Sequence, residues 1–262
     1  MDYKTLLVEQ RGVALHVMLN RPDVHNAFND ELIREAVDLF STLEQTRGVR
    51  AVVLRGGGQN FCAGADLNWM AKMVSYGRQE NIRDASLLAK MFAVIDECPI
   101  PVIGRIQGAA IGGGVGLVAV CDIAISMESS KFGLSEVKLG ILPAVISPYV
   151  IGKIGASHAR ALFLTGERFS AARALSIGLV HRLAATDEEL DSAVDETVAG
   201  LTSSGPEAVA ECKKLIDFVA SNDRAESIPY TIEAISQRRV SAEGQEGMSA
   251  FLRKEKPEWT GR

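Results

Sequence analysis

Apolar and polar positions alternate at the start of the chain. Leu6–Glu9 and Val13–Leu19 have the two-residue period of β-strands, and Gln10-Arg11-Gly12 between them is expected to form a turn. Further strands are predicted at Ala51–Leu54, Val102–Ile106 and Asp122–Met127. The first of these three is uniformly apolar, which is typical of a strand covered on both faces.

Helical periods lie between these strands. Asn29 is a suitable N-cap for a helix that continues to about Arg47, and Asn81–Glu97 has one apolar side. The alternation of strands and helices predicts a mainly parallel sheet with right-handed crossovers. Beyond about Thr186 only helical segments follow. We therefore expect an α/β core over residues 1–185 and an all-helical C-terminal region over residues 186–262.

Composition and charge narrow the class of protein. The 262 residues are 47% hydrophobic, enough for one large domain or a domain with an appendage. The net charge of −5 lacks the basic footprint of a nucleic-acid partner, although a local basic cluster could still bind an anion. No secretory signal and no apolar run of the roughly 20 residues that span a bilayer is apparent. A cytoplasmic protein without a membrane partner is the expectation.

The strongest chemical signal is a glycine cluster where a helix should begin. Gly112, Gly113, Gly114 and Gly116 follow an apolar segment, and a helix that opens on glycines presents bare N–H groups at its positive end. Residues 61–67, Phe-Cys-Ala-Gly-Ala-Asp-Leu, offer a second loop. Two such donors facing one oxygen would form an oxyanion hole. A tight helix–strand packing joint is the alternative, since neither a dinucleotide fingerprint nor a Walker loop is present.

Glu136 is the candidate for proton transfer. It lies in Phe132–Gly140 among apolar residues, and poor solvation would raise its pKa toward neutral pH. An ordinary surface glutamate is the alternative. The four histidines are scattered singly, without a nucleophile elbow or His-x-x-x-His spacing, so neither a catalytic triad nor a metal site is expected.

A basic segment lies near the C-terminus. Arg253-Lys254-Glu255-Lys256 follows Phe251-Leu252. A solvated helix end is one interpretation. The other is a phosphate-binding lysine beside an aromatic ring that stacks on a purine.

These motifs together resemble those of the crotonase (enoyl-CoA hydratase/isomerase) superfamily. The resemblance extends from about residue 6 to the C-terminus, and its order is specific. It comprises Leu19-Asn20-Arg21-Pro22, Asn26-Ala27-Phe28-Asn29, Phe61–Leu67, Gly108 with Gly112-Gly113-Gly114, Cys121-Asp122, Phe132-Gly133, Glu136, Leu164-Thr165-Gly166 and Gly178-Leu179-Val180.

The resemblance implies a fold, a substrate and an assembly. The fold is a spiral of ββα turns with a helical C-terminal trimerisation region, in homotrimers or dimers of trimers. The substrate is an acyl-CoA, with coenzyme A as part of the substrate and no separate cofactor. The amides of Ala65 and Gly113 would bind the thioester oxygen. Coenzyme A would contact Val24, Ala27, Ala63, Asp66 and Leu67, with Phe251 and Lys254 often supplied by a neighbouring subunit.

One position departs from the family pattern. Members with two catalytic glutamates carry the first of them three residues after the second oxyanion glycine, and this chain has Gly116 there. The chain is then either an isomerase or other member with a single acid, or a hydratase in which Gly116 makes room for a larger substrate.

The finer resemblance favours the hydratase. Residues 64–70, 142–148 and 239–247 resemble bacterial methylglutaconyl-CoA hydratases of leucine breakdown and their isohexenylglutaconyl-CoA relatives. Their substrate carries a distal carboxylate, to which Gly116 would offer space and no charge. Reversible hydration of a 3-methylglutaconyl-type thioester, with Glu136 moving the proton, is the expected activity, and Δ3-Δ2 enoyl-CoA isomerisation is the alternative.

Overall fold

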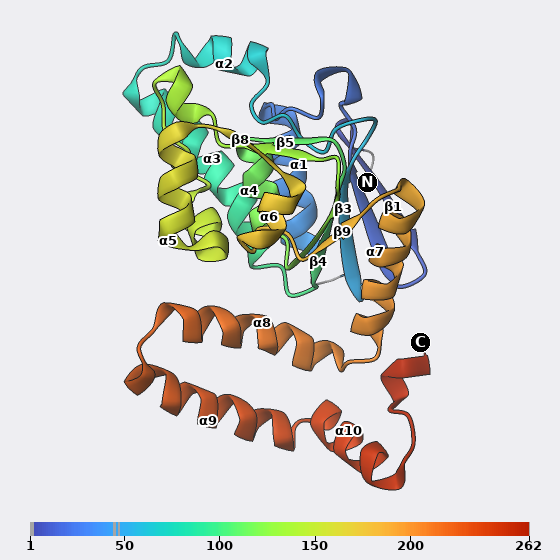
Figure 1. The fold of residues 1–262 in the computed structure, drawn as a ribbon. Helices are drawn as coiled ribbons and strands as arrows, with labels where there is room; N and C mark the ends of the chain where they lie inside the picture. The colour runs from blue at the N-terminus through green and yellow to red at the C-terminus, as the bar shows by residue number, and fades with distance from the viewer. Residues whose placement is uncertain (1–2, 44–45, 47, 262) are drawn as a thin grey trace.

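A six-stranded sheet forms the centre of the molecule (Figure 1). The computed structural model describes residues 3–43, 46 and 48–261. The strand order is β1-β2-β3-β4-β6-β9, and only the first pair is antiparallel. The strands are β1 (Leu6–Arg11), β2 (Ala14–Leu19), β3 (Ala51–Gly56), β4 (Val102–Ile106), β6 (Ile123–Met127) and β9 (Arg182–Ala184). The predicted mainly parallel sheet is confirmed.

Alternating strand residues divide the core between the two faces of this sheet. Val52 and Leu54 face the larger cluster, which is built with α1 (Asp30–Thr42), α3 (Arg78–Asp96), α4 (Gly113–Val120) and α5 (Ser147–Thr165). Ala51 and Val53 face the smaller cluster beneath α7 (Asp187–Thr202). Both faces of β3 are therefore covered, as its uniformly apolar sequence indicates.

Short elements complete the core near the candidate site. A second sheet, in the order β5-β7-β8, consists of β5 (Ala109–Ile111), β7 (Lys131–Gly133) and β8 (Arg168–Ser170). The remaining short helices are η1 (Pro22–Val24), α2 (Leu67–Met73), η3 (Glu136–Leu139) and α6 (Ala171–Ser176). The sequence analysis missed the strands of the second sheet, because three residues are too few to show a two-residue period.

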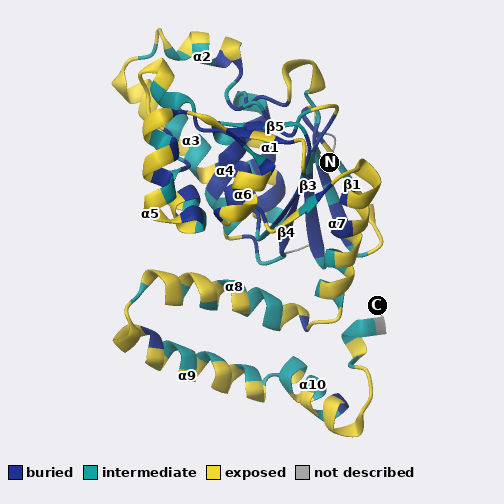
Figure 2. Ribbon diagram, in the orientation of Figure 1, coloured by how far each residue is buried: buried dark blue, intermediate teal, exposed yellow. Residues whose placement is uncertain are grey.

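The regular elements between β9 and residue 261 are all helices, as expected. After α7 come α8 (Pro206–Ser221), α9 (Arg224–Val240), α10 (Ala242–Arg253) and η4 (Glu258–Gly261). Figure 1 shows α8, α9 and α10 beyond one end of the core, and Figure 2 shows that their surfaces are mostly exposed or half-buried. Within the described ranges, none of the helices combines the length and hydropathy that a bilayer crossing requires.

Several element boundaries differ from the sequence expectations, and three of them have a clear physical reason or limit. The turn predicted at residues 10–12 is wrong, because Arg11 still pairs with Ala14 and the reversal falls at Gly12, whose φ is +57°. The helix expected to reach Arg47 ends at Thr42, and residues 44, 45 and 47 lie outside the described part. Helix α3 begins at Arg78 rather than residue 81, since the Glu80 carboxylate accepts a hydrogen bond from the Gly77 amide at 2.7 Å.

Candidate active site

The loop after β3 holds the Ala65 amide in an unpaired position. The Phe28 amide donates to Gly64 O at 2.6 Å, and the Asp66 amide donates to Phe28 O at 2.8 Å. Successive peptide groups of an extended segment point in opposite directions, so the Ala65 N–H points away from Phe28. Among the described residues, no acceptor bonds to this N–H.

The start of α4 supplies a second unpaired amide. Gly112 has φ +54° and ψ −120°, a backbone conformation that only glycine adopts readily, and its own amide donates to Gly133 O at 2.8 Å. This turn starts the helix at Gly113. The first amides of a helix lack intrahelical acceptors and carry the positive end of the helix dipole. The Gly113 amide has no acceptor within the described part of the chain.

Phe28 brings the two amides to the same place. It pairs with the loop of Ala65 through its backbone, and its ring lies so close to Gly113 that a Cβ there would overlap it. A Cβ at Gly64 would lie 2.8 Å from Ile111 O and 3.7 Å from Gly113 N. The glycines therefore permit a close approach of the two loops. The tight packing that the sequence analysis gave as an alternative to the oxyanion hole is thus what brings the two N–H donors together.

Glu136 lies against this donor pair. It is the first residue of η3, and its Oε1 lies 3.1 Å from the place that a Cβ of Gly112 would take. Its Oε2 is buried and has no hydrogen-bond partner among the described residues. Burial raises the pKa of the Glu136 carboxyl, and a hydrogen bond from its own backbone opposes this weakly. A carboxyl whose pKa is raised therefore lies beside the turn that presents the free Gly113 N–H.

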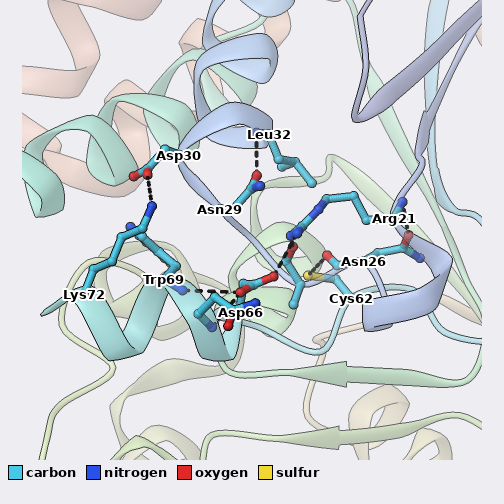
Figure 3. Close-up of polar contacts among 11 residues, drawn as sticks. Arg21, Asn26, Asn29, Asp30, Leu32, Cys62, Asp66, Trp69 and Lys72 are labelled. Carbon is cyan, nitrogen blue, oxygen red and sulfur yellow. Dashed lines mark hydrogen bonds and ion pairs between the residues drawn. The ribbon is translucent and has the colours of Figure 1, made fainter. Parts of the chain in front are cut away.

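Asp66 organises the first loop rather than offering a free contact. Its carboxylate, 4% exposed, pairs with Arg21 at 2.8 Å and caps α2 by accepting from the amides of Asn68 and Trp69, as Figure 3 shows in part. Burial tends to raise the pKa of this carboxyl, but the bonds from Arg21 and the two amides together lower it. Asp66, expected to contact coenzyme A, is therefore fully engaged within the chain, and we assign it a positioning role.

Asn26 is a positioning residue for which the sequence analysis gave no role. It is completely buried, and its Nδ2 donates to Gly57 O and Asn60 O, both at 2.8 Å. Its Oδ1 accepts from the Arg21 amide at 2.9 Å (Figure 3). Its φ of +57° is a left-handed conformation that asparagine tolerates better than most residues. The sequence offered one signal for this role, namely that Asn26 directly precedes the apolar residues Ala27 and Phe28.

The other residues expected at the coenzyme fall into two groups. Val24, Ala27, Ala63 and Leu67 flank the loops just described, and Leu67 is 81% exposed. Phe251, 82% exposed, lies in α10 and Lys254 is its C-cap; α10 lies at the far end of the molecule from α2 in Figure 1. The structure of one chain does not bring these two residues to the donor pair.

The room expected beside Gly116 is absent. Gly116 is buried in α4, and a Cβ there would overlap Cγ2 of Ile146 and would lie 2.9 Å from Cε1 of Phe92. Two apolar side chains already fill the space that the missing side chain leaves. The expectation that Gly116 opens the pocket is therefore wrong, and the glycine instead allows Ile146 to pack against the helix backbone.

The described residues include no group of three His, Cys, Asp or Glu side chains placed to hold a metal ion. The site offers two backbone donors and a half-buried carboxyl, that of Glu136. Such a set can hold a negatively charged oxygen and move a proton next to it.

The fold and this donor pair define a class of enzyme that stabilises an oxyanion. The chain belongs to the enoyl-CoA hydratase/isomerase family, whose pattern matches residues 9–262. The crystal structure of an enoyl-CoA hydratase from Shewanella pealeana has the same crotonase fold, with a TM-score of 0.94 and 39% identity over 98% of this chain and 96% of that chain.

Two relatives represent both reactions in the family name. A putative enoyl-CoA hydratase of Thermus thermophilus is 32% identical over 95% of this chain and 98% of that protein. A peroxisomal Delta(3,5)-Delta(2,4)-dienoyl-CoA isomerase of Arabidopsis thaliana is 30% identical over 98% of this chain and 97% of that protein. Family membership thus supports an enoyl-CoA substrate but does not identify its acyl group.

Proposed function

We propose that this enzyme adds water reversibly across the α,β double bond of an enoyl-CoA. The thioester oxygen accepts hydrogen bonds from the amides of Ala65 and Gly113. Hydration passes through an enolate, whose charge develops on that oxygen, and preorganised donors contribute about 3 kcal/mol each to its stabilisation. The observation that supports this function most directly is the pairing of two unbonded amides with the buried Glu136 carboxyl.

Glu136 is the proton carrier in this proposal. In hydration it activates the water or protonates the α-carbon of the enolate, and in dehydration it removes the α-proton. Its raised pKa suits both directions, because a carboxyl that exchanges its proton nearer to pH 7 is a better acid and base there. Gly116 and its neighbours Ile146 and Phe92 supply no second carboxyl, so Glu136 serves both steps.

The substrate that we propose is of the 3-methylglutaconyl type. Its support is the resemblance of residues 64–70, 142–148 and 239–247 to hydratases of such substrates. The proposal rests on this resemblance and not on space beside Gly116, which Ile146 and Phe92 fill. A panel of enoyl-CoA thioesters with and without a distal carboxylate tests this choice.

Isomerisation is the second candidate. The apolar wall beside Gly116 favours it, since a shift of the double bond needs one proton carrier and no activated water. The two reactions differ in absorbance, because hydration removes the conjugated thioester chromophore and a shift into conjugation creates it. Exchange of the α-proton in heavy water would accompany either reaction and would be missing in a protein that only binds CoA esters.

The decisive experiment replaces Glu136. Glu136→Gln keeps the size of the side chain and removes its acid–base function, so kcat should fall about 100- to 10,000-fold while the Kd for acetyl-CoA stays unchanged. Glu128→Gln, at an exposed turn, is the matched control and should keep full activity. Normal turnover by the Glu136 variant would remove this residue from the mechanism.

A further inference from the structure

A second pocket lies on the face of the sheet that α7 covers. Its volume is about 510 Å³, and it lies at the carboxyl ends of β3, β4 and β6. None of Ala65, Gly113 and Glu136 lines it. In α/β folds the carboxyl edge of parallel strands is a frequent place for ligands.

Two arginines stand side by side in this pocket. Arg55 and Arg105 are directly opposite each other on β3 and β4, in the register that also pairs Val53 with Ile103. Val53 and Ile103 belong to the cluster under α7, so both arginines, two residues further along, face the same side. Like charges in this relation destabilise a sheet unless other groups balance them.

Only one of the two charges is balanced within the chain. Arg105 pairs with Asp191 at 2.5 Å and with Asp187 at 2.9 Å, both on α7. Arg55 is half-buried, and no described residue forms an ion pair or a side-chain hydrogen bond with its guanidinium. The pocket therefore offers one unpaired fork of N–H donors beside two carboxylates that are 68% and 59% exposed.

Gln107 adds an acceptor whose orientation is certain. Its Nε2 donates to Gly56 O at 2.6 Å and to Gly58 O at 3.3 Å, and carbonyl oxygens only accept, so the amide cannot be reversed. Its Oε1 is then the opposite end of the group. This atom is buried in a residue only 9% exposed and has no hydrogen-bond partner among the described residues. Buried polar atoms are normally bonded, so Gln107 contributes an unsatisfied acceptor to the polar wall of the pocket.

We infer that this pocket binds a small phosphomonoester that also carries hydroxyl groups, such as a sugar phosphate. The phosphate oxygens accept from the Arg55 guanidinium, which matches their geometry in a two-pronged contact. Hydroxyl groups of the ligand donate to the exposed carboxylates of Asp187 and Asp191. The volume suits a molecule larger than phosphate alone.

Ribose 5-phosphate is the probe for a test with the whole chain. Isothermal titration calorimetry should show binding that is tighter than that of inorganic phosphate or of ribose, because each of these supplies only half of the contacts. Arg55→Gln should weaken it at least about tenfold, which is the usual effect of removing a charge-assisted contact. Arg34→Gln, on the exposed side of α1, removes the same charge elsewhere and should leave affinity unchanged.

Competition separates this pocket from the thioester site. Saturating acetyl-CoA should not displace ribose 5-phosphate, and Arg55→Gln should hydrate enoyl-CoA at the normal rate. Displacement by acetyl-CoA, absence of binding, or equal losses in the Arg55 and Arg34 variants would each overturn the inference. If Arg55→Gln does not fold, a crystal structure of the native chain with ribose 5-phosphate decides, since density must lie between Arg55 and the carboxylates of Asp187 and Asp191.

Discussion

Single glycines determine how closely the parts of the site approach. Gly112 needs its positive φ to start α4, whereas Gly113 needs the absence of a side chain because the Phe28 ring lies against it. Gly116 has ordinary helical geometry and is required only by its neighbours Ile146 and Phe92. Each glycine has a different physical reason, so substitutions at the three positions should have different consequences.

Gly116→Ala should lower the free energy of unfolding by about 1–3 kcal/mol, the usual cost of overpacking a core. The new Cβ must displace Ile146 or Phe92. Urea unfolding measures the loss. Gly152→Ala in α5 is the matched control, because nothing lies within 4 Å of a Cβ there and the change should be neutral or stabilising.

A double-mutant cycle tests the cause of this effect. In an Ile146→Ala background, Gly116→Ala should cost less, since the closest atom, Cγ2 of Ile146, is gone and the new cavity lets Phe92 move away. Additive losses in the double variant would show that Ile146 is not what requires the glycine.

At the scale of elements, the short helix α2 depends on Asp66. Asp66→Ala removes the cap of α2 and the Arg21 ion pair, and it should lower the free energy of unfolding by about 2 kcal/mol. Because the adjacent Ala65 amide then loses its fixed direction, kcat should fall more than KM rises. Steady-state kinetics and urea unfolding measure the two effects.

Asp223→Ala is the control for this change. Asp223 caps α9 through the amides of Ala225 and Glu226, in the C-terminal helices. It should cost stability in the same way and leave kcat unchanged. An equal loss of kcat in both variants would mean that Asp66 acts only through global stability.

The contact of α3 with α8 contains a carboxyl that opposes folding when ionised. Burial, and next the charge of Asp217, raise the pKa of Asp96 to about 6, with a smaller effect in the same direction from Asp122. Lys213 and Lys153 act in the opposite direction. Asp96 ends α3, and Asp217 and Lys213 belong to α8, so this pKa depends on how the C-terminal helices meet the core.

Asp96→Asn should therefore stabilise the protein at pH 7. The folded chain holds the Asp96 proton up to about pH 6, because its pKa is about 6, whereas the unfolded chain releases it near the ordinary pKa of 3.8. The folded state binds more protons in this window, so native stability from this group falls as the pH rises through it. The expected gain is about 1 kcal/mol at pH 7, after allowance for solvent screening of a half-exposed group.

Unfolding at several pH values checks the sign. The gain should shrink below about pH 4, where Asp96 is protonated in both states. Asp23→Asn, at an exposed position, is the matched control and should leave stability at pH 7 unchanged. A destabilised Asp96 variant at pH 7 would show that the ionised carboxyl is favourable where it lies.

At the scale of the whole molecule, the exposed apolar side chains of α10, such as Phe251, favour an association of several chains. We expect a native mass of three or six times the 28.1 kDa of one chain, measured by light scattering. Phe251 would then stack on the adenine of a CoA bound to a neighbouring chain. Phe251→Ala should raise KM for enoyl-CoA about five- to tenfold, the value of one base–aromatic stack, with little change in kcat.

The control for this prediction is Leu7→Ala, another exposed apolar residue, on β1. It should leave both kinetic constants unchanged. A monomeric protein, or a Phe251 variant with a normal KM, would show that α10 does not contribute to the coenzyme A site.

Long periodic segments were predictable and short or strained ones were not. The limits of β4 and the N-cap of α1 at Asn29 agree with the sequence patterns, because burial of an apolar face imposes a period on residues in contact with it. The turn at Gly12 was misplaced, and β5, β7 and β8 were missed. At these positions pairing with distant segments decides the conformation. The residues of such a short segment do not show which distant segment it will pair with.

Apolar periods along the sequence determined the parallel sheet and the helical C-terminal region, because burial imposes a period on the residues in contact with the core. The resemblance of the motifs indicated the family and the candidates Ala65 and Gly113, and the apolar surroundings of Glu136 indicated the third candidate. Only the tertiary structure decided that Asp66 and Asn26 hold the loops and that Ile146 and Phe92 fill the space at Gly116. Both outcomes depend on which distant side chain meets a given position. That is a property of packing in three dimensions, which residue spacing along the chain does not encode.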